Sequence, residues 1–164
     1  MKHPVPLTAT KPSPRVIVVS RTFDAPRVLV FEAFTDPEMV RQWLWGPDEW
    51  PMVDCTIDLK VGGTYRYVWG HREKGDMGMG GVFHEIVPPK RLVYTELFDE
   101  DWTGGETLVT ALFDEKDGRT TVTTTVRYSS EEARDGALKT GMLRGWGQAY
   151  DRLDDHLVQH MAKE

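Results

Sequence analysis

A run of short strands between residues 52 and 128 constrains the fold of this chain more than any other feature. About six segments rich in β-branched and aromatic residues follow one another, separated by the turn sequences Gly62-Gly63, Pro88-Pro89 and Asp117-Gly118. Strands joined by such short turns run antiparallel, because a parallel pair needs a long crossover. The run therefore predicts one antiparallel sheet, and a curved sheet needs another element to cover its concave face.

Helical patterns stand on both sides of this run. Residues 15–23 (RVIVVSRTF) predict one further strand, and helix-start signals after it predict two short helices at residues 28–34 and 39–45. Near the C-terminus, Ser129 opens a capping-box sequence, and apolar residues then recur every three or four positions to about residue 160. This order predicts an α+β fold in which a long C-terminal helix covers a curved antiparallel sheet.

The composition is that of a soluble globular protein, with 40% apolar and 28% charged residues. We expect one domain at residues 15–162, and the four prolines of residues 1–14 predict a flexible N-terminal tail. The net charge of −6 argues against a nucleic-acid partner and against an anionic membrane surface. A single cysteine, no membrane-length apolar stretch and no signal-peptide pattern lead us to expect a cytoplasmic protein.

Three glycines lie within two turns of the predicted C-terminal helix, although each costs about 1 kcal/mol relative to alanine in a helix interior. One ridge of this helix is large throughout: Leu138, Met142, Trp146 and Tyr150. The adjacent ridge is empty at Gly141 and Gly145, while Gly147 lies on neither. Helix periodicity alone favours close packing of the sheet against the glycines. The alternative is that the empty half leaves room for a ligand.

Aromatic side chains alternate along two of the predicted strands and so share one face of each. The first face carries Tyr65, Tyr67 and Trp69, and the second carries Tyr94, Glu96 and Phe98. Large rings with a few polar atoms are typical of a small-molecule cavity, which moves the balance toward the ligand interpretation. The predicted ligand-binding residues are Trp43, Tyr65, Tyr67, Trp69, Met77, Met79, Tyr94, Phe98, Met142, Gly145, Trp146 and Tyr150.

Residues 70–81 (GHREKGDMGMGG) hold five glycines and predict a loop between two strands. The loop is either a hairpin tip or a lid over the cavity mouth, with Met77 and Met79 as adaptable apolar contacts.

His71 and Glu96 are the candidate catalytic residues if the protein is an enzyme, as an acid–base pair in an apolar cavity. The alternative is that Glu96 pairs with Arg66 or Arg144 and that His71 lies on a loop surface. Elsewhere, His156 and His160 have the spacing of a helical metal pair but no third ligand, and Cys55 has no histidine partner on its strand. No metal site and no cofactor motif are predicted.

Four segments, TDPEMVRQWLWGP, DLKVGGTYRY, EIVPPKRLVYTELF and SSEEARDGALKTGMLRGWGQAYDRL, resemble the AHSA1-like family (activator of Hsp90 ATPase homologue 1-like) of the START/Bet v 1-like superfamily. The resemblance covers residues 15–160. It implies a helix-grip fold, with two small helices at the opening of the cavity. It also implies that the segment holding Trp43, Trp45 and Trp50 borders the cavity mouth, so that one of the three touches the ligand, and Trp43 matches the family's motif most directly. The alternative is that these tryptophans pack the second short helix onto the edge of the sheet. The superfamily includes lipid and hormone carriers, cyclases and aromatases, so the fold alone does not fix the activity.

Three functions follow as expectations. The sequence favours a cytoplasmic binding protein for a small hydrophobic or aromatic molecule. The alternatives are an enzyme (cyclase, dehydratase or hydrolase) that uses the same cavity with His71 and Glu96, and an Hsp90-type co-chaperone. The co-chaperone is favoured least, because a separate Hsp90-binding domain has no counterpart in the sequence. An exposed edge strand could pair two copies into a homodimer.

Overall fold

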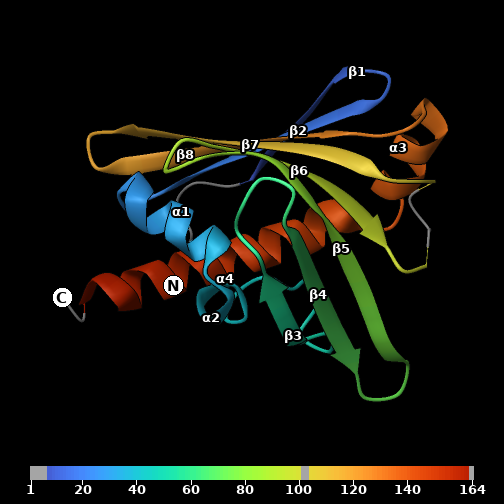
Figure 1. The fold of residues 1–164 in the computed structure, drawn as a ribbon, viewed down its shortest axis with the longest axis horizontal. Helices are drawn as coiled ribbons and strands as arrows, with labels where there is room; N and C mark the ends of the chain where they lie inside the picture. Colours follow the sequence, from blue (N-terminus) through green and yellow to red (C-terminus); the bar gives the residue numbers. More distant parts are fainter. Residues whose placement is uncertain (1–6, 101–103, 163–164) are drawn as a thin grey trace.

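The computed structural model describes residues 7–100 and 104–162. Over these residues an eight-stranded antiparallel sheet runs in the order β1-β2-β8-β7-β6-β5-β4-β3 and curves around the long helix α4 (Figure 1). The strands are β1 (Thr8–Ser13), β2 (Val16–Phe23), β3 (Met52–Ile57), β4 (Thr64–His71), β5 (Gly75–Val87), β6 (Arg91–Phe98), β7 (Thr107–Lys116) and β8 (Arg119–Arg127). The helices are α1 (Arg27–Thr35), α2 (Pro37–Val40), α3 (Glu131–Leu138) and α4 (Met142–Ala162).

The core forms where the concave face of the sheet meets α1 and α4. Every second residue of β2, β7 and β8 is buried over most of each strand, as the alternation of a half-covered sheet requires. The buried face of α4 consists of Ala149, Tyr150, Leu153 and Leu157. The expected α+β helix-grip architecture, with two short helices after an N-terminal strand, is confirmed.

A buried ion pair fixes α4 against the sheet. The Arg21 guanidinium on β2 donates to Asp151 at 2.7 Å and to Asp154 at 2.8 Å, and its side chain is 2% exposed. Because an arginine is buried only when its charge is matched, this pair sets the position of the helix along the strands.

The prediction of a flexible tail over residues 1–14 is wrong for Thr8–Ser13. This segment is the edge strand β1, and Thr8, Ala9 and Thr10 pair with Ser20, Val19 and Val18 of β2. Its side chains are all exposed, so it carries none of the alternation that reveals a strand in sequence. Pro12 is tolerated because one side of an edge strand needs no hydrogen-bond donor. Residues 1–6 lie outside the described part of the chain.

The second short helix is also shorter than predicted. Asp36 caps it by accepting from the Glu38 amide at 3.0 Å, but α2 ends at Val40 instead of continuing to residue 45. The Leu44 carbonyl accepts a hydrogen bond from the Trp69 indole at 2.8 Å. Beyond α2 the chain continues in turns, with the Trp43 and Leu44 amides both donating to the Val40 carbonyl, before it bonds to the sheet.

The predicted C-terminal helix is broken into two at Gly141. This residue has φ +82°, the left-handed conformation that commonly ends a helix at glycine. The start signal is also displaced by one position, since Ser130 and not Ser129 accepts from the Ala133 amide at 3.0 Å. Gly141 therefore lies outside a helix interior and does not destabilise one. The break also places Leu138 in α3 and Met142 in α4.

Residues 70–81 form strand and not the predicted loop. Only residues 72–74 turn, and β5 begins at Gly75. A Cβ atom on Gly81 would lie 1.9 Å from the Thr95 carbonyl oxygen, and one on Gly78 would lie 2.4 Å from the Arg66 and Asp99 side chains. At Gly81 the close neighbour is backbone, so this glycine is required by the sheet rather than by loop flexibility. At Gly78 the neighbours are the ends of two flexible side chains, which can shift.

Candidate ligand cavity

A cavity of about 940 Å³ lies between the sheet and the N-terminal part of α4. Strands β4 to β8, the segment 43–50 and α4 all contribute side chains to it. Every residue predicted to bind a ligand lines this cavity: Trp43, Tyr65, Tyr67, Trp69, Met77, Met79, Tyr94, Phe98, Met142, Gly145, Trp146 and Tyr150. The structure thus brings these residues together, while their contact with a ligand stays a prediction.

The aromatic wall comes from alternate positions on neighbouring strands. Tyr67 pairs with Met79 of β5, and Met79 pairs with Phe98 of β6, so their side chains lie side by side. The Tyr65 ring centroid lies 4.9 Å from that of Tyr67 and 5.6 Å from that of Tyr94. Such edge and tilted contacts hold the rings in fixed orientations.

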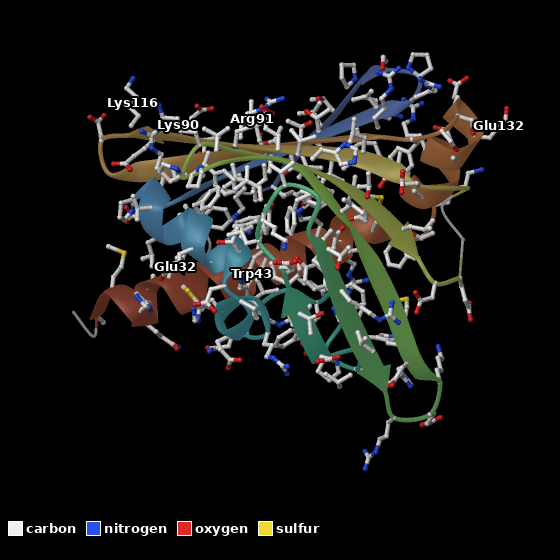
Figure 2. The ribbon with its side chains drawn as sticks, viewed as in Figure 1. Glu32, Trp43, Lys90, Arg91, Lys116 and Glu132 are labelled. Carbon is white, nitrogen blue, oxygen red and sulfur yellow. The ribbon has the colours of Figure 1, made fainter. Side chains whose placement is uncertain are left out.

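Trp43 and Tyr150 form the opposite, helical side. Trp43 is 1% exposed, and its indole N–H donates to the Ala33 carbonyl at 2.9 Å. Figure 2 shows it in the middle of the molecule, and its ring lies 5.9 Å from that of Tyr150. Trp45 and Trp50 line the cavity as well.

Glu96 is the acidic side chain set within the aromatic wall, between Tyr94 and Phe98 on β6. Among the described residues, its carboxyl has no hydrogen-bond or ion-pair partner. The predicted alternative partners are placed elsewhere: Arg66 forms a bidentate pair with Asp99 at 2.6 and 2.9 Å, and Arg144 lies exposed on the first turn of α4. Burial raises the pKa of Glu96 to about 7.

The tyrosines around Glu96 stay protonated. Burial first, and the charge of Glu96 second, raise the pKa of Tyr65, Tyr94 and Tyr128. The Tyr65 hydroxyl donates to the Thr95 carbonyl at 2.6 Å. The hydroxyls of Tyr67 and Tyr94 have no such bond to the described residues, which leaves both available to a guest molecule.

The structure does not bring the candidate acid–base pair together in the cavity, since Glu96 lines it and His71 does not. The His71 imidazole is not part of the cavity lining, and its Nδ1 accepts from the Glu73 and Lys74 amides at 3.0 Å each. Its ring lies 4.8 Å from that of Trp50. Because Nδ1 accepts two amides of the β4–β5 turn, His71 shapes that turn.

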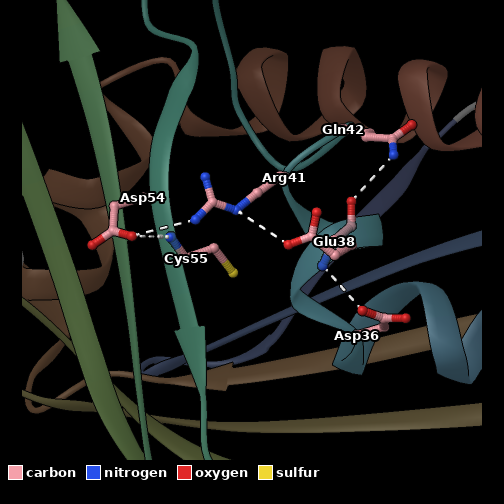
Figure 3. Close-up of polar contacts among 6 residues, drawn as sticks. All are labelled: Asp36, Glu38, Arg41, Gln42, Asp54 and Cys55. Carbon is pink, nitrogen blue, oxygen red and sulfur yellow. Dashed lines mark hydrogen bonds and ion pairs between the residues drawn. The ribbon is translucent and has the colours of Figure 1, made fainter.

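The remaining candidate groups carry little chemistry. Burial raises the pKa of the Cys55 thiol to about 11, so it stays protonated at neutral pH. Figure 3 shows its amide donating to Asp54, which also faces Arg41 at 3.4 Å and so links β3 to the end of α2. The rings of His156 and His160 lie 6.3 Å apart. Across the described ranges, no three His, Cys, Asp or Glu side chains gather as a metal site would require.

Gly141 and Gly145 both line the cavity, and Gly145 also has a backbone neighbour that the sequence did not predict. Gly145 of α4 lies against Gly46, and a Cβ atom on either glycine would stand 3.3 to 3.5 Å from the other's Cα. At Gly145 the helix therefore packs against the segment 43–50 at the cavity rim, whereas farther along it packs against the sheet. Around Gly147 a Cβ atom would meet nothing within 4 Å.

Sequence reasoning missed Arg152, which holds this rim. Its guanidinium donates to the Trp45 and Gly46 carbonyls and to Asp48, the last two at 2.7 and 2.8 Å. It also lies 4.4 Å from the centre of the Trp45 ring. Arg152 stands seven positions after Gly145 and so shares its helix face. The seven-residue spacing could be read from the sequence. That the segment 43–50 packs against this face of the helix could not.

An antiparallel sheet that grips a long helix around an aromatic-lined cavity defines the START/Bet v 1-like class of helix-grip proteins. Within this class, the chain belongs to the family described as activator of Hsp90 ATPase homolog 1-like protein, whose model matches residues 24–158.

Solved structures of similar proteins support this assignment. A protein from Rhodobacter sphaeroides is 33% identical to this chain and superposes with a TM-score of 0.89. The match covers 94% of this chain and 99% of that chain. A protein from Arthrobacter aurescens is 25% identical with a TM-score of 0.83, over 93% and 91% of the two chains. A protein from Nitrosomonas europaea, 23% identical, shares the fold with a TM-score of 0.82. The match covers 93% of this chain and 99% of that chain.

No protein with a curated description matches the chain. Within residues 7–100 and 104–162, none of the helices has both the length and the apolar character needed to cross a membrane.

Proposed function

We propose that this protein is a cytoplasmic binding protein for a small hydrophobic or aromatic molecule, held between the sheet and α4. The cavity of about 940 Å³ carries this proposal. It lies within the roughly 300–1,000 Å³ range of small-molecule sites, and its lining is mainly apolar, with many aromatic side chains and a few polar groups. Displacing water from such apolar walls favours binding.

Binding without turnover fits the geometry better than catalysis. The enzyme alternative relied on His71 and Glu96 acting together, and His71 instead bonds to its own turn. Glu96 alone can hold a proton near neutral pH, but a single carboxyl without an activated partner is more readily explained as a recognition group.

The proposal is tested by ligand-induced stabilisation with a library of hydrophobic and aromatic compounds. A ligand at 100 times its Kd adds about 2.7 kcal/mol to the free energy of unfolding. For a domain of this size that raises Tm by roughly 5–10 °C. Val126→Phe, which adds volume inside the cavity, should weaken the effect, because Val126 is 4% exposed and lines it.

Val28→Phe is the matched control, because Val28 is 67% exposed on α1. Equal responses of both variants would place the ligand outside the cavity and contradict the proposal.

The family description also names an Hsp90 activator, and we propose no such role for this chain. The ATPase rate of purified Hsp90, measured with and without the protein, tests this directly. A stimulated rate would replace the binding proposal with an interaction function.

A further inference from the structure

We propose that the cavity selects molecules in which a hydrophobic body carries a cationic amine, and that this amine pairs with the Glu96 carboxylate between Tyr67 and Tyr94. The inference rests on the proposed binding function and specifies the chemistry of its ligand.

The first step is that no side chain of the described protein neutralises Glu96. Desolvation by burial is the cause of its raised pKa, and no lysine or arginine contributes an opposing effect. Arg66 is engaged by Asp99, and Arg21 by Asp151 and Asp154. A carboxylate that is partly buried and has no cation beside it is less stable than one in water. A ligand that brings a cation to Glu96 therefore gains an ion pair that the protein itself does not supply.

The second step is that the surroundings of Glu96 suit an ammonium group. Tyr67 on β4 and Tyr94 on β6 offer hydroxyl oxygens that accept no hydrogen bond from the described protein. An ammonium has three donors, which matches one carboxylate and two phenolic oxygens. The faces of the tyrosine and tryptophan rings carry negative potential and attract cations.

The third step concerns the remaining charges of the lining. Among the described residues that line the cavity, Arg144 on α4 is the cationic one, and it is exposed. The acidic residues Asp48 and Glu49 of the lining are exposed as well. Asp48 is paired with Arg152 at 2.8 Å. Acidic groups thus outnumber basic ones along the lining, so a cation enters more easily than an anion.

Amine binding should strengthen as the pH rises from 6 to 8. A bound ammonium favours ionised Glu96, which must first lose its proton. With a pKa of about 7, the ionised fraction of Glu96 rises roughly tenfold between pH 6 and pH 8. The titratable groups that face it are Tyr65 and Tyr67 on β4, Tyr94 on β6 and Tyr128 after β8, and their raised pKa values keep all four neutral over this range. A ligand that accepts a hydrogen bond from protonated Glu96 would show the opposite trend.

The test uses three fluorescent probes with one aromatic body: 4-(pyren-1-yl)butylamine, 4-(pyren-1-yl)butanol and 4-(pyren-1-yl)butyric acid. Each is titrated into the wild-type protein at pH 6 and pH 8. We expect the amine to bind at least tenfold more tightly than the alcohol at pH 8, and the acid to bind weakest. The amine's advantage should shrink by about tenfold at pH 6.

Glu96→Gln keeps the shape of the side chain and removes its charge. It should abolish the preference for the amine while leaving the affinity for the alcohol within about twofold. Glu32→Gln is the matched control, because it removes a charge from an exposed position on α1, labelled in Figure 2. An amine preference that survives in Glu96→Gln, or an alcohol that binds as tightly as the amine, overturns the inference while leaving the binding function intact. Failure of all three probes to bind counts against both.

Discussion

Gly46 and Gly145 bring the rim of the cavity and the C-terminal helix into backbone contact. A Cβ atom on Gly46 would lie 3.3 Å from the Gly145 Cα, and the reciprocal distance is 3.5 Å. Both residues line the cavity, so the contact forms part of the wall of the space in which we place a ligand. The small face of α4 thus lets the rim segment 43–50 dock directly on the helix.

Gly145→Leu should therefore destabilise the protein by about 1–3 kcal/mol, because a large side chain must push the rim away from α4. Gly147→Leu makes the same chemical change two residues later, where there is open space. It should be neutral or add up to about 0.8 kcal/mol through helix propensity. Urea unfolding of both variants measures the difference, and equal effects would show that the Gly46–Gly145 contact carries no constraint.

Arg152→Lys should loosen the rim. Lysine cannot reproduce the planar donor fork that reaches two carbonyls and Asp48 while lying over Trp45. We expect a loss of about 1–2 kcal/mol, because the acceptors that lose their donor are half-buried. Hydrogen exchange should also become faster at residues 45–50.

Asp48→Asn provides the comparison, because the Asp48 side chain is 97% exposed and its removal should cost less than 1 kcal/mol. Should the two variants exchange alike, Arg152 would not be the residue that holds the rim.

The empty protein should lose stability as the pH rises from about 4.5 to about 7. The folded-state pKa of Glu96 is about 7 against an ordinary 4.5, so the folded protein binds the proton more tightly than the unfolded chain. The stabilisation is complete below pH 4.5 and is lost as Glu96 ionises, with an amplitude of up to about 3 kcal/mol from this residue.

Glu96→Gln removes this contribution, and at pH 8 the variant should be more stable than the wild type. Denaturant unfolding at pH 5 and pH 8 compares the two proteins. A wild type that differs from Glu96→Gln by the same amount at both pH values would mean that Glu96 has an ordinary pKa.

Most of the architecture could be predicted because its signals are local and repeated. The strand run 52–128 and the apolar period of the C-terminal segment indicated a sheet around a helix. Strand β1 was missed since its side chains are all exposed and one is proline. The break at Gly141 was missed because a glycine in a periodic segment does not reveal its own φ.

The candidate cavity could be assembled from alternation, but its polar partners could not. Alternation places Tyr65, Tyr67 and Glu96 on known faces of their strands, and register then brings them together. Whether Glu96 meets a cation depends on contacts between distant elements, such as Arg66 turning to Asp99. The partners of His71 could not be predicted either. Its position on the face of Tyr67 suggested a catalytic role, but its Nδ1 accepts hydrogen bonds from two amides of the β4–β5 turn.

Native mass spectrometry of gently purified protein tests the central claim most directly. We predict a specific additional mass that disappears on denaturation, and a Val126→Phe variant that carries less of it than Val28→Phe. The added mass would narrow the ligand class, and fragmentation of the released ligand would then show whether it contains an amine. An apo mass for the wild type, together with no compound from the hydrophobic library raising Tm, would contradict a ligand-binding function for the cavity.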